Sequence, residues 1–396
     1  MHGQWIGTTA LPSGQARVIL NIDSDKTTEF MFHVLSEKSS FGLLAKGVWS
    51  NDRADLKAIE FSRCLEDGDL FTPNERGLTD EERDLRNGIT ISLARQGAQI
   101  TTATWKTGTA EGEVQFPPID LDRRVQAYRC ESWDAFKSWI TQLRTKEDIF
   151  LYRGHGSHQF RLETSLHRAG RFRLDRYWNE VVPEFRDRTE AAMGVRFEKT
   201  SGDDQGIVLG LAQHHGLPTP MLDVTASPYV AAFFAFSDAI ESQRDAQAHS
   251  HVRVYAFARK FIDALAAPLV SLRRAEVFVN SLGVSSRFNP RLTAQQGKFL
   301  VTNVASLESL VRFLEEQTNQ VVMFAADIPA ACAPAALQDL TFMGLTAATM
   351  FPGLDGIGKM MRHQMLFSHK HLDAEPSLQE SMNSSAEHPV DTPLKP

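Results

Sequence analysis

The periodicity of the hydrophobic residues changes once along the chain, at the segment FPPID that covers residues 116–120. Before this segment, short runs such as QARVILNI and AQITTATW alternate apolar with polar residues, as β-strands do. After it, helical and extended patterns are mixed, without the regular alternation of a doubly wound fold. We therefore predict an α+β protein with two domains, an all-β sandwich or small barrel at residues 1–118 and a mixed α+β domain at 125–370.

Residues that start and stop helices bracket the elements predicted for the second domain. Ser132 precedes one amphipathic helix, and Ser227 followed by Pro228 begins another. Gly216 is predicted to take the left-handed conformation at the end of a helix over 206–215. Strands are predicted at 148–154, 220–224, 251–258 and 321–328. Residues 371–396 are polar and rich in Pro and Ser, which predicts a disordered tail.

The charge, the cysteines and the apolar runs argue against several classes of protein. A formal charge of −7 leaves binding to nucleic acid unsupported. Three widely separated cysteines are typical of a reducing compartment. The first residues lack the pattern of a signal peptide, and Asp or Pro interrupts each apolar run before the roughly 20 residues that a membrane helix needs. These features predict a cytoplasmic protein without membrane contact.

The segment 213–236 places polar residues at the ends of predicted elements. His214 and His215 close a helix, and Asp223 and Thr225 lie at the end of a short strand. Polar groups at element ends can converge on a cleft, or they can satisfy backbone groups in turns, and both interpretations stay open. Adjacent histidines point about 100° apart on a helix and do not share one ion readily, so we predict no metal site.

A second candidate segment begins at Tyr152, Arg153 and Gly154, which end an apolar strand. Gly154 would let a ligand approach the backbone closely. Six arginines and no lysine lie between Arg153 and Arg176, and the planar guanidinium suits phosphate or carboxylate. The alternative is that these are surface arginines that pair with acids on neighbouring helices. Further along, Gln295 and Gln296 precede an apolar strand and form either a cleft edge or a polar turn.

Taken together, these segments resemble the FRG domain, a family named for its Phe/Tyr-Arg-Gly motif. The resemblance rests on YRG at 152–154, QHHGLPT, LDVT and SPYVAAFFA within 213–235, QQGKF at 295–299 and LTAATMFPGLDGI at 345–357. Where the family usually has Arg before Leu-Leu-Asp-Trp-Thr, this chain has Pro220, and Val224 replaces the Trp. Residues 1–118 lie outside the resemblance and are predicted to be a sensor or docking domain for a protein partner.

The resemblance implies a fold similar to ADP-ribosyltransferases and a site that accepts NAD or another nucleotide. Arg153 would hold a phosphate or ribose, His214 and Asp223 would orient the substrate, and Gln296 would take the late-strand position. The candidate catalytic residues are Arg153, His214, His215, Asp223 and Gln296, and the candidate substrate-binding residues are Tyr152, Gly154, Gln213, Thr219, Thr225 and Gln295.

Three functions compete. The first is an intracellular bacterial effector of the toxin or phage-defence type, whose FRG domain acts on NAD or another nucleotide without a tightly bound cofactor. The second is a non-catalytic module that recognises a phosphorylated ligand, because the late position lacks the Glu that transferases use beside positive charge. The third is a metal-dependent nuclease, which rests only on the 13 histidines.

Overall fold

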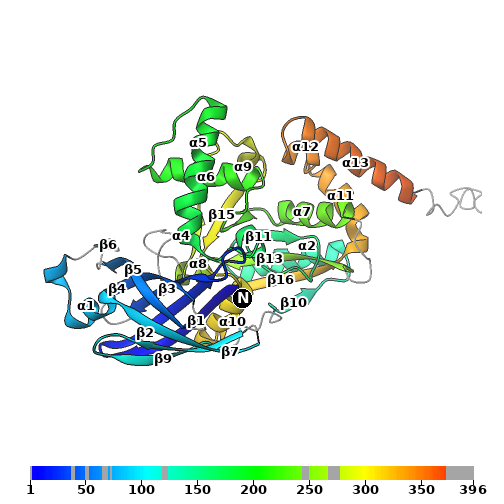
Figure 1. Cartoon of the computed structure of the whole chain (residues 1–396). Coiled ribbons are helices and arrows are strands. Elements are labelled where there is room, and N and C mark those ends of the chain that lie inside the picture. Colours follow the sequence, from blue (N-terminus) through cyan, green and yellow to red (C-terminus); the bar gives the residue numbers. More distant parts are fainter. Residues whose placement is uncertain are drawn as a thin grey trace, which may run out of the picture.

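The computed structural model describes residues 2–36, 41–49, 53–64, 70–71, 74–97, 99–117, 124–242, 249–265 and 277–371. It contains an N-terminal β-sheet and a mixed part of helices and strands, which confirms the α+β class (Figure 1). The predicted tail at 371–396 lies outside the described residues, apart from His371. No helix among these residues combines the length and the apolar character that crossing a membrane requires.

The N-terminal strands form an antiparallel, nearly closed barrel. In the described part of the chain, the strand order is β4-β3-β2-β1-β9-β8-β7-β5-β6, and β4 also pairs with β5. The pairing between neighbouring strands of the barrel is shortest between β1 and β9, which pair only at Thr8 and Gln115. The strands are β1 (Gly3–Leu11), β2 (Gly14–Ile22), β3 (Glu29–Ser36), β4 (Phe41–Val48), β5 (Arg53–Cys64), β6 (Leu70–Phe71), β7 (Ile89–Gln96), β8 (Gln99–Lys106) and β9 (Glu111–Gln115).

Inward-facing residues of the barrel form one hydrophobic core that includes Trp5, Val18, Phe30, Ile91 and Trp105. Helix α1 (Asp80–Asn87) begins with a capping box, in which the Thr79 side chain accepts from the Glu82 amide and the Glu82 carboxylate accepts from the Thr79 amide. Strand β4 was not anticipated, because its sequence FGLLAKGV does not alternate.

The second sheet has the order β10-β16-β13-β11-β12-β15-β14 among the described residues, and only β10 and β16 run parallel. Its strands are β10 (Ala127–Arg129), β11 (Ile149–His155), β12 (Met221–Thr225), β13 (His251–Ala258), β14 (Val279–Leu282), β15 (Gly297–Thr302) and β16 (Met323–Pro329). The four strands predicted in this region are therefore confirmed, with ends that differ by no more than two residues.

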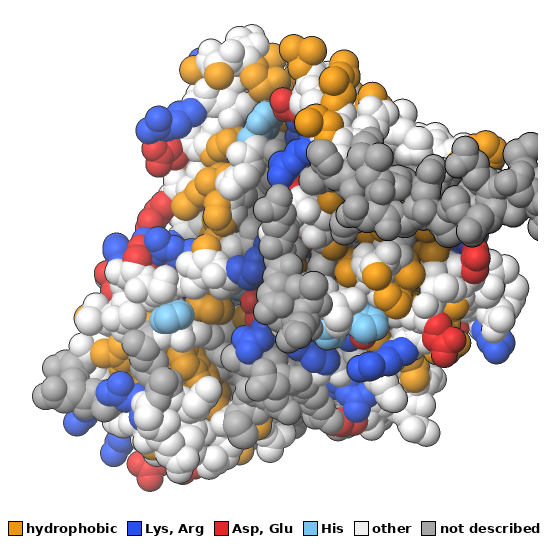
Figure 2. All heavy atoms as spheres, turned by 90° about the vertical axis from the view of Figure 1, so that its right-hand side faces the viewer, with side chains coloured by type: hydrophobic (Ala, Val, Ile, Leu, Met, Phe, Trp, Pro, Cys, Tyr) orange, Lys and Arg blue, Asp and Glu red, His pale blue; other side chains and the backbone are white. Residues whose placement is uncertain are grey.

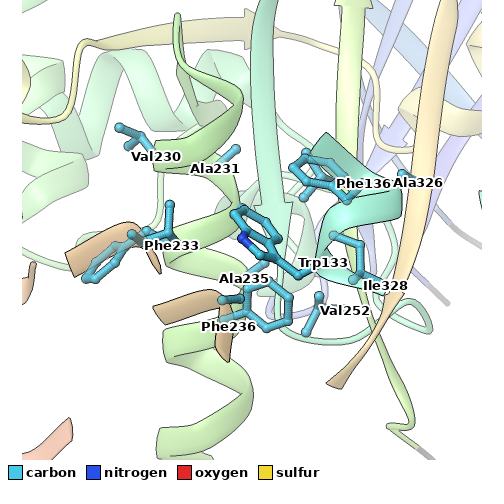
Figure 3. Close-up of a cluster of buried hydrophobic side chains, with 14 of the residues drawn as sticks. Trp133, Phe136, Val230, Ala231, Phe233, Ala235, Phe236, Val252, Ala326 and Ile328 are labelled. Carbon is cyan, nitrogen blue, oxygen red and sulfur yellow. The ribbon is translucent and has the colours of Figure 1, made fainter. Parts of the chain in front are cut away.

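Helices cover both faces of this sheet. On one face, α2 (Trp133–Lys146), α7 (Pro228–Glu241) and α11 (Ala333–Phe342) pack Trp133 and Phe236 against Val252 and Ile328 (Figure 3). On the other face, α8 (Arg259–Leu265) and α10 (Leu307–Thr318) cover Leu151 and Tyr255. The remaining helices are α3 (Ser165–Arg168), α4 (Leu174–Arg176), a π-helical turn (Tyr177–Val181), α5 (Val182–Met193), α6 (Gly202–His214), α9 (Pro290–Ala294), α12 (Ala347–Met350) and α13 (Leu354–His371).

Charged groups connect the barrel with the mixed part, beside a small apolar cluster that joins Ile19 to Val277 and Val304. Arg173, on the segment that leads into α4, donates to Glu29 of the barrel at 3.1 Å and to Asp175 at 2.9 Å. Arg176 contacts Asp23 at 2.7 Å and Asp25 at 3.0 Å. Asp23 also accepts from the backbone amides of residues 172 and 173. The second half of the arginine-rich segment therefore pairs with acids of the barrel. Pairing with acids was one of the two interpretations, but these acids lie in a strand and a loop rather than on helices.

Candidate functional site

A cleft opens where two central strands of the mixed sheet diverge. Strands β11 and β12 pair only at Tyr152 and Thr225, whereas each pairs over a longer stretch with its other neighbour. The cleft has a volume of about 840 Å³ and is lined by parts of β11, β12, β15, α6, α7 and α9 and by the loop after β11. A split sheet exposes backbone groups and side chains from its middle, so the cleft lies at the centre of the domain.

Arg153 spans the gap between the two strands. Its Nη1 donates to the backbone oxygen of Asp223 at 2.5 Å and lies 4.0 Å from the Asp223 carboxylate. Its Nε donates to His155 Nε2 at 3.0 Å, which requires that nitrogen of the imidazole to be unprotonated. Desolvation lowers the pKa of Arg153, and Asp223 opposes this effect only in part. Burial and the neighbouring Arg153 charge hold the pKa of His155 well below its usual value, so the ring is neutral.

Asp223 is held by a chain of side chains that starts beneath the cleft. The buried Thr219 donates its hydroxyl to Gln213 Oε1, and Gln213 Nε2 donates to Asp223 Oδ2 at 2.7 Å. One half of the Asp223 side chain remains exposed to the cleft, at 51%. Next to this chain, His214 hydrogen-bonds to Asn289, and burial lowers its pKa although Asp223 acts in the opposite direction.

Two glycines in and after β11 are required by helix α7. A Cβ at Gly154 would lie 1.9 Å from the backbone oxygen of Ala231, and a Cβ at Gly156 would lie 2.1 Å from the Asp238 carboxylate. Gly154 lines the cleft, so the prediction that it lets a ligand approach the backbone stays a prediction. The glycine lets α7 pack directly on the strand, and the helix then forms one wall of the cleft.

The other predicted site residues are placed differently. The Thr225 hydroxyl donates to the backbone oxygen of Gln295, and the Gln295 amide donates to Met350, so both groups fix the cleft edge. Tyr152 borders the cleft, but its ring packs in the hydrophobic cluster beneath α7, and its hydroxyl is buried there without a partner. His215 is exposed at the end of α6, and neither it nor Gln296 lines the cleft.

Sequence reasoning missed several residues of the cleft. His155 was not among the candidate residues, although it directly follows the YRG motif. Arg161 and Arg168 were counted in the arginine-rich segment but not assigned to the cleft that they line. Phe234, Lys298 and Phe351 lie within the segments that carry the resemblance, but they were not named as site candidates. Arg291, which also lines the cleft, was not named either.

No group of three potential metal ligands occurs among the residues for which the structure gives positions. The nuclease hypothesis therefore gains no support from the described part of the chain.

Comparison with known proteins agrees with the resemblance seen in the sequence. Residues 148–244 match the family model of the FRG domain. This range runs from β11 to the end of α7 and contains Arg153, Gln213, His214 and Asp223. No curated protein and no solved structure gives a match to this chain. This part of the chain is therefore similar to the FRG domain, and the N-terminal barrel lies outside the matched range.

Proposed function

We propose that the FRG domain of this chain binds a nucleotide, with NAD as the preferred class, and cleaves or transfers part of it. The observation that carries this proposal is the state of Arg153. Its side chain is only 16% exposed, borders the cleft, and faces a carboxylate 4.0 Å away rather than one in direct contact. A buried cation that is incompletely neutralised favours an incoming anion, and a guanidinium suits a phosphate.

The composition of the cleft supports the same ligand class. Five cationic side chains and three carboxylates are among the described residues that line it. The cations are Arg153, Arg161, Arg168, Arg291 and Lys298, and the carboxylates are Glu163, Asp223 and Asp238. Phenylalanines from separate elements add apolar faces, on which an aromatic base can stack. A ligand with both phosphates and an aromatic ring matches this mixture better than a simple anion does.

The chemistry that we propose centres on Asp223. When the bond between the ribose and nicotinamide breaks, positive charge develops on the ribose, nicotinamide leaves with the bonding electrons, and water or an acceptor group adds to the same carbon. The half-exposed Asp223 carboxylate is the anionic group available to stabilise this charge, and Gln213 fixes its orientation. His155 orients the Arg153 guanidinium through its unprotonated nitrogen.

The wider role that we propose is that of an intracellular effector of the toxin or phage-defence type, with an ADP-ribosyltransferase-like activity. The support for this role is the FRG match. The barrel would then serve as the sensor or docking domain for a protein partner.

The test compares ligand binding and NAD consumption by the purified wild-type protein with those of three variants. We expect Arg153→Lys to impair ligand binding nearly as much as Arg153→Ala, because a point charge does not replace the planar fork. We expect Asp223→Asn to lower turnover by about 10²–10³ while ligand affinity and melting temperature stay close to wild type. The matched controls are Arg188→Lys and Asp187→Asn on the exposed surface of α5. An Asp223→Asn variant with full turnover would refute the catalytic role.

One observation favours the second candidate, a binding module without turnover. The Asp223 backbone oxygen accepts from Arg153 and its carboxylate Oδ2 accepts from Gln213, so both oxygens have partners within the chain. In that case Asp223→Asn changes only ligand affinity or melting temperature, and no NAD is consumed by the wild type.

A further inference from the structure

Helix α13 uses one side to pack on the domain. A Cβ at Gly356 would lie 1.8 Å from the backbone oxygen of Phe351, so the start of the helix is in close contact with the preceding turn. His363 is 7% exposed and its Nε2 lies 2.8 Å from the carboxylate of Glu241 on α7. Lys359 lies 3.8 Å from the same carboxylate, and Met360 packs against the hydrophobic core. These contacts fix which side of the helix faces outward.

The outward side carries an apolar stripe. Leu354 is 85% exposed, Ile357 46%, Met361 56% and Met365 66%. Their spacing of three, four and four residues places all four along one side of the helix. Figure 2 shows hydrophobic side chains gathered at the top of the molecule, on the side where Figure 1 places α12 and α13. A surface helix normally turns its apolar stripe toward the core, and an exposed stripe marks an interaction site.

We propose that this stripe pairs with the α13 stripe of a second copy of the chain, with the two helices antiparallel. The stripe is self-complementary about a point between Ile357 and Met361, so that each Ile357 packs against Met361 of the other copy. None of the four stripe residues lines the cleft, although Asp355 on the flank of the stripe lies 3.4 Å from Arg291, which does. The proposal does not rest on the proposed function.

The flanking charges select the antiparallel arrangement. Asp355 and Arg362 are both exposed, and their positions seven residues apart place them on the same flank of the stripe. In an antiparallel pair, this flank of one helix meets the same flank of the other, so Asp355 of each copy faces Arg362 of its partner. Asp355 already lies 3.4 Å from Arg291 and is 79% exposed on its side chain, which leaves it accessible to a second cation. A parallel pair would not bring these opposite charges together.

A seam formed by one helix from each copy is smaller than the interfaces of permanent dimers. We therefore expect a reversible dimer with a dissociation constant on the order of 10 μM. Sedimentation equilibrium of the full chain should show the monomer mass at low concentration and approach twice that mass at about 100 μM.

Two sets of variants test the surface. Met361→Glu should reduce dimerisation at least about tenfold, because it places like charges in an apolar seam. The matched control is Met193→Glu, which changes an exposed methionine on α5, 40% exposed, and should leave the dimer unchanged. Asp355→Arg and Arg362→Asp should each weaken the dimer, and the double variant should restore it.

Melting temperatures of all variants show whether the monomers remain folded. The proposal is overturned if the wild type stays monomeric at about 100 μM, if Met193→Glu weakens the dimer as much as Met361→Glu, or if the double charge variant fails to restore it. A chain ending at His371 that dimerises when the full chain does not would identify residues 372–396 as the occupant instead, and would also overturn it.

Discussion

Arg173 and Arg153 are both buried arginines, yet they have opposite electrostatic environments. Arg173 lies at the contact between barrel and mixed part, is 3% exposed on its side chain, and contacts the carboxylates of Glu29 and Asp175 at 3.1 and 2.9 Å. Arg153 lies at the cleft, is 16% exposed, and contacts a backbone oxygen and a neutral imidazole. Burial tends to lower the pKa of both groups. For Arg173 the hydrogen bonds to Asp175 and Glu29 reverse this effect and raise the pKa, whereas for Arg153 the pKa stays lowered.

The difference separates structural from functional arginines within one short segment. A guanidinium that contacts two carboxylates is already neutralised and does not attract a further anion. It holds two parts of the chain together. A guanidinium whose contacts are neutral still attracts an anion, and the guanidinium of Arg153 faces the cleft. The distinction depends on which acids the fold brings near, because the residue type is the same in both cases.

The largest effect that we expect comes from Arg173→Ala. Removing this side chain leaves the buried Asp175 carboxylate without its cation, whereas Glu29 keeps Lys46 at 3.2 Å. The loss should lower the free energy of unfolding by about 3–5 kcal/mol. Urea unfolding measures the change. The control is Arg188→Ala, since Arg188 is 79% exposed and pairs with Glu184 one helical turn away, where we expect about 0.5 kcal/mol or less. Equal losses for Arg173→Ala and Arg188→Ala would show that Arg173 does not stabilise the fold through its buried ion pairs.

Acid should weaken the contact between the barrel and the mixed part. Hydrogen bonds from Arg176 and Arg171 lower the pKa of Asp25, and Lys46 and Arg173 lower that of Glu29. Groups with a lowered pKa in the folded state contribute stability that is fully present above their ordinary values of 3.8 and 4.5 and is lost as the pH falls below them. We expect Asp25→Asn to flatten the decline in melting temperature between pH 5 and more acidic conditions. If the melting temperature of Asp25→Asn falls with pH as steeply as that of the wild type, Asp25 does not contribute to the acid sensitivity.

The smallest effect on stability should come from Arg153→Met. Its partners face the cleft, where water can replace the guanidinium, so we expect the free energy of unfolding to stay within about 1 kcal/mol of wild type. Arg253 on the adjacent strand β13 is the matched comparison, because it contacts Asp327 at 2.7 and 2.9 Å and its side chain is 7% exposed. Arg253→Met should cost several times more. A large loss for Arg153→Met in chemical unfolding would show that Arg153 is structural.

Local pattern predicted most of the elements because their signals lie within a few residues. Alternation predicted most strands of the barrel, Ser132 and Ser227 predicted two helix starts, and Gly216 takes the expected left-handed conformation with φ of +82°. Strand β4 was not predicted, because apolar and polar residues do not alternate in its sequence. In each success the physical cause is local: side-chain periodicity, a capping hydroxyl, or a backbone angle that glycine adopts without strain.

The sequence by itself determined the α+β class, the YRG strand end and the group of Gln213, His214 and Asp223 as site candidates. Only the tertiary structure decided which arginines pair with carboxylates and which face the cleft. It also showed that Gly154 accommodates α7 and that His155 completes the Arg153 network. The physical reason is that compensation of a buried charge depends on groups far apart in the chain, such as Glu29 and Arg173, and no local pattern records their distance.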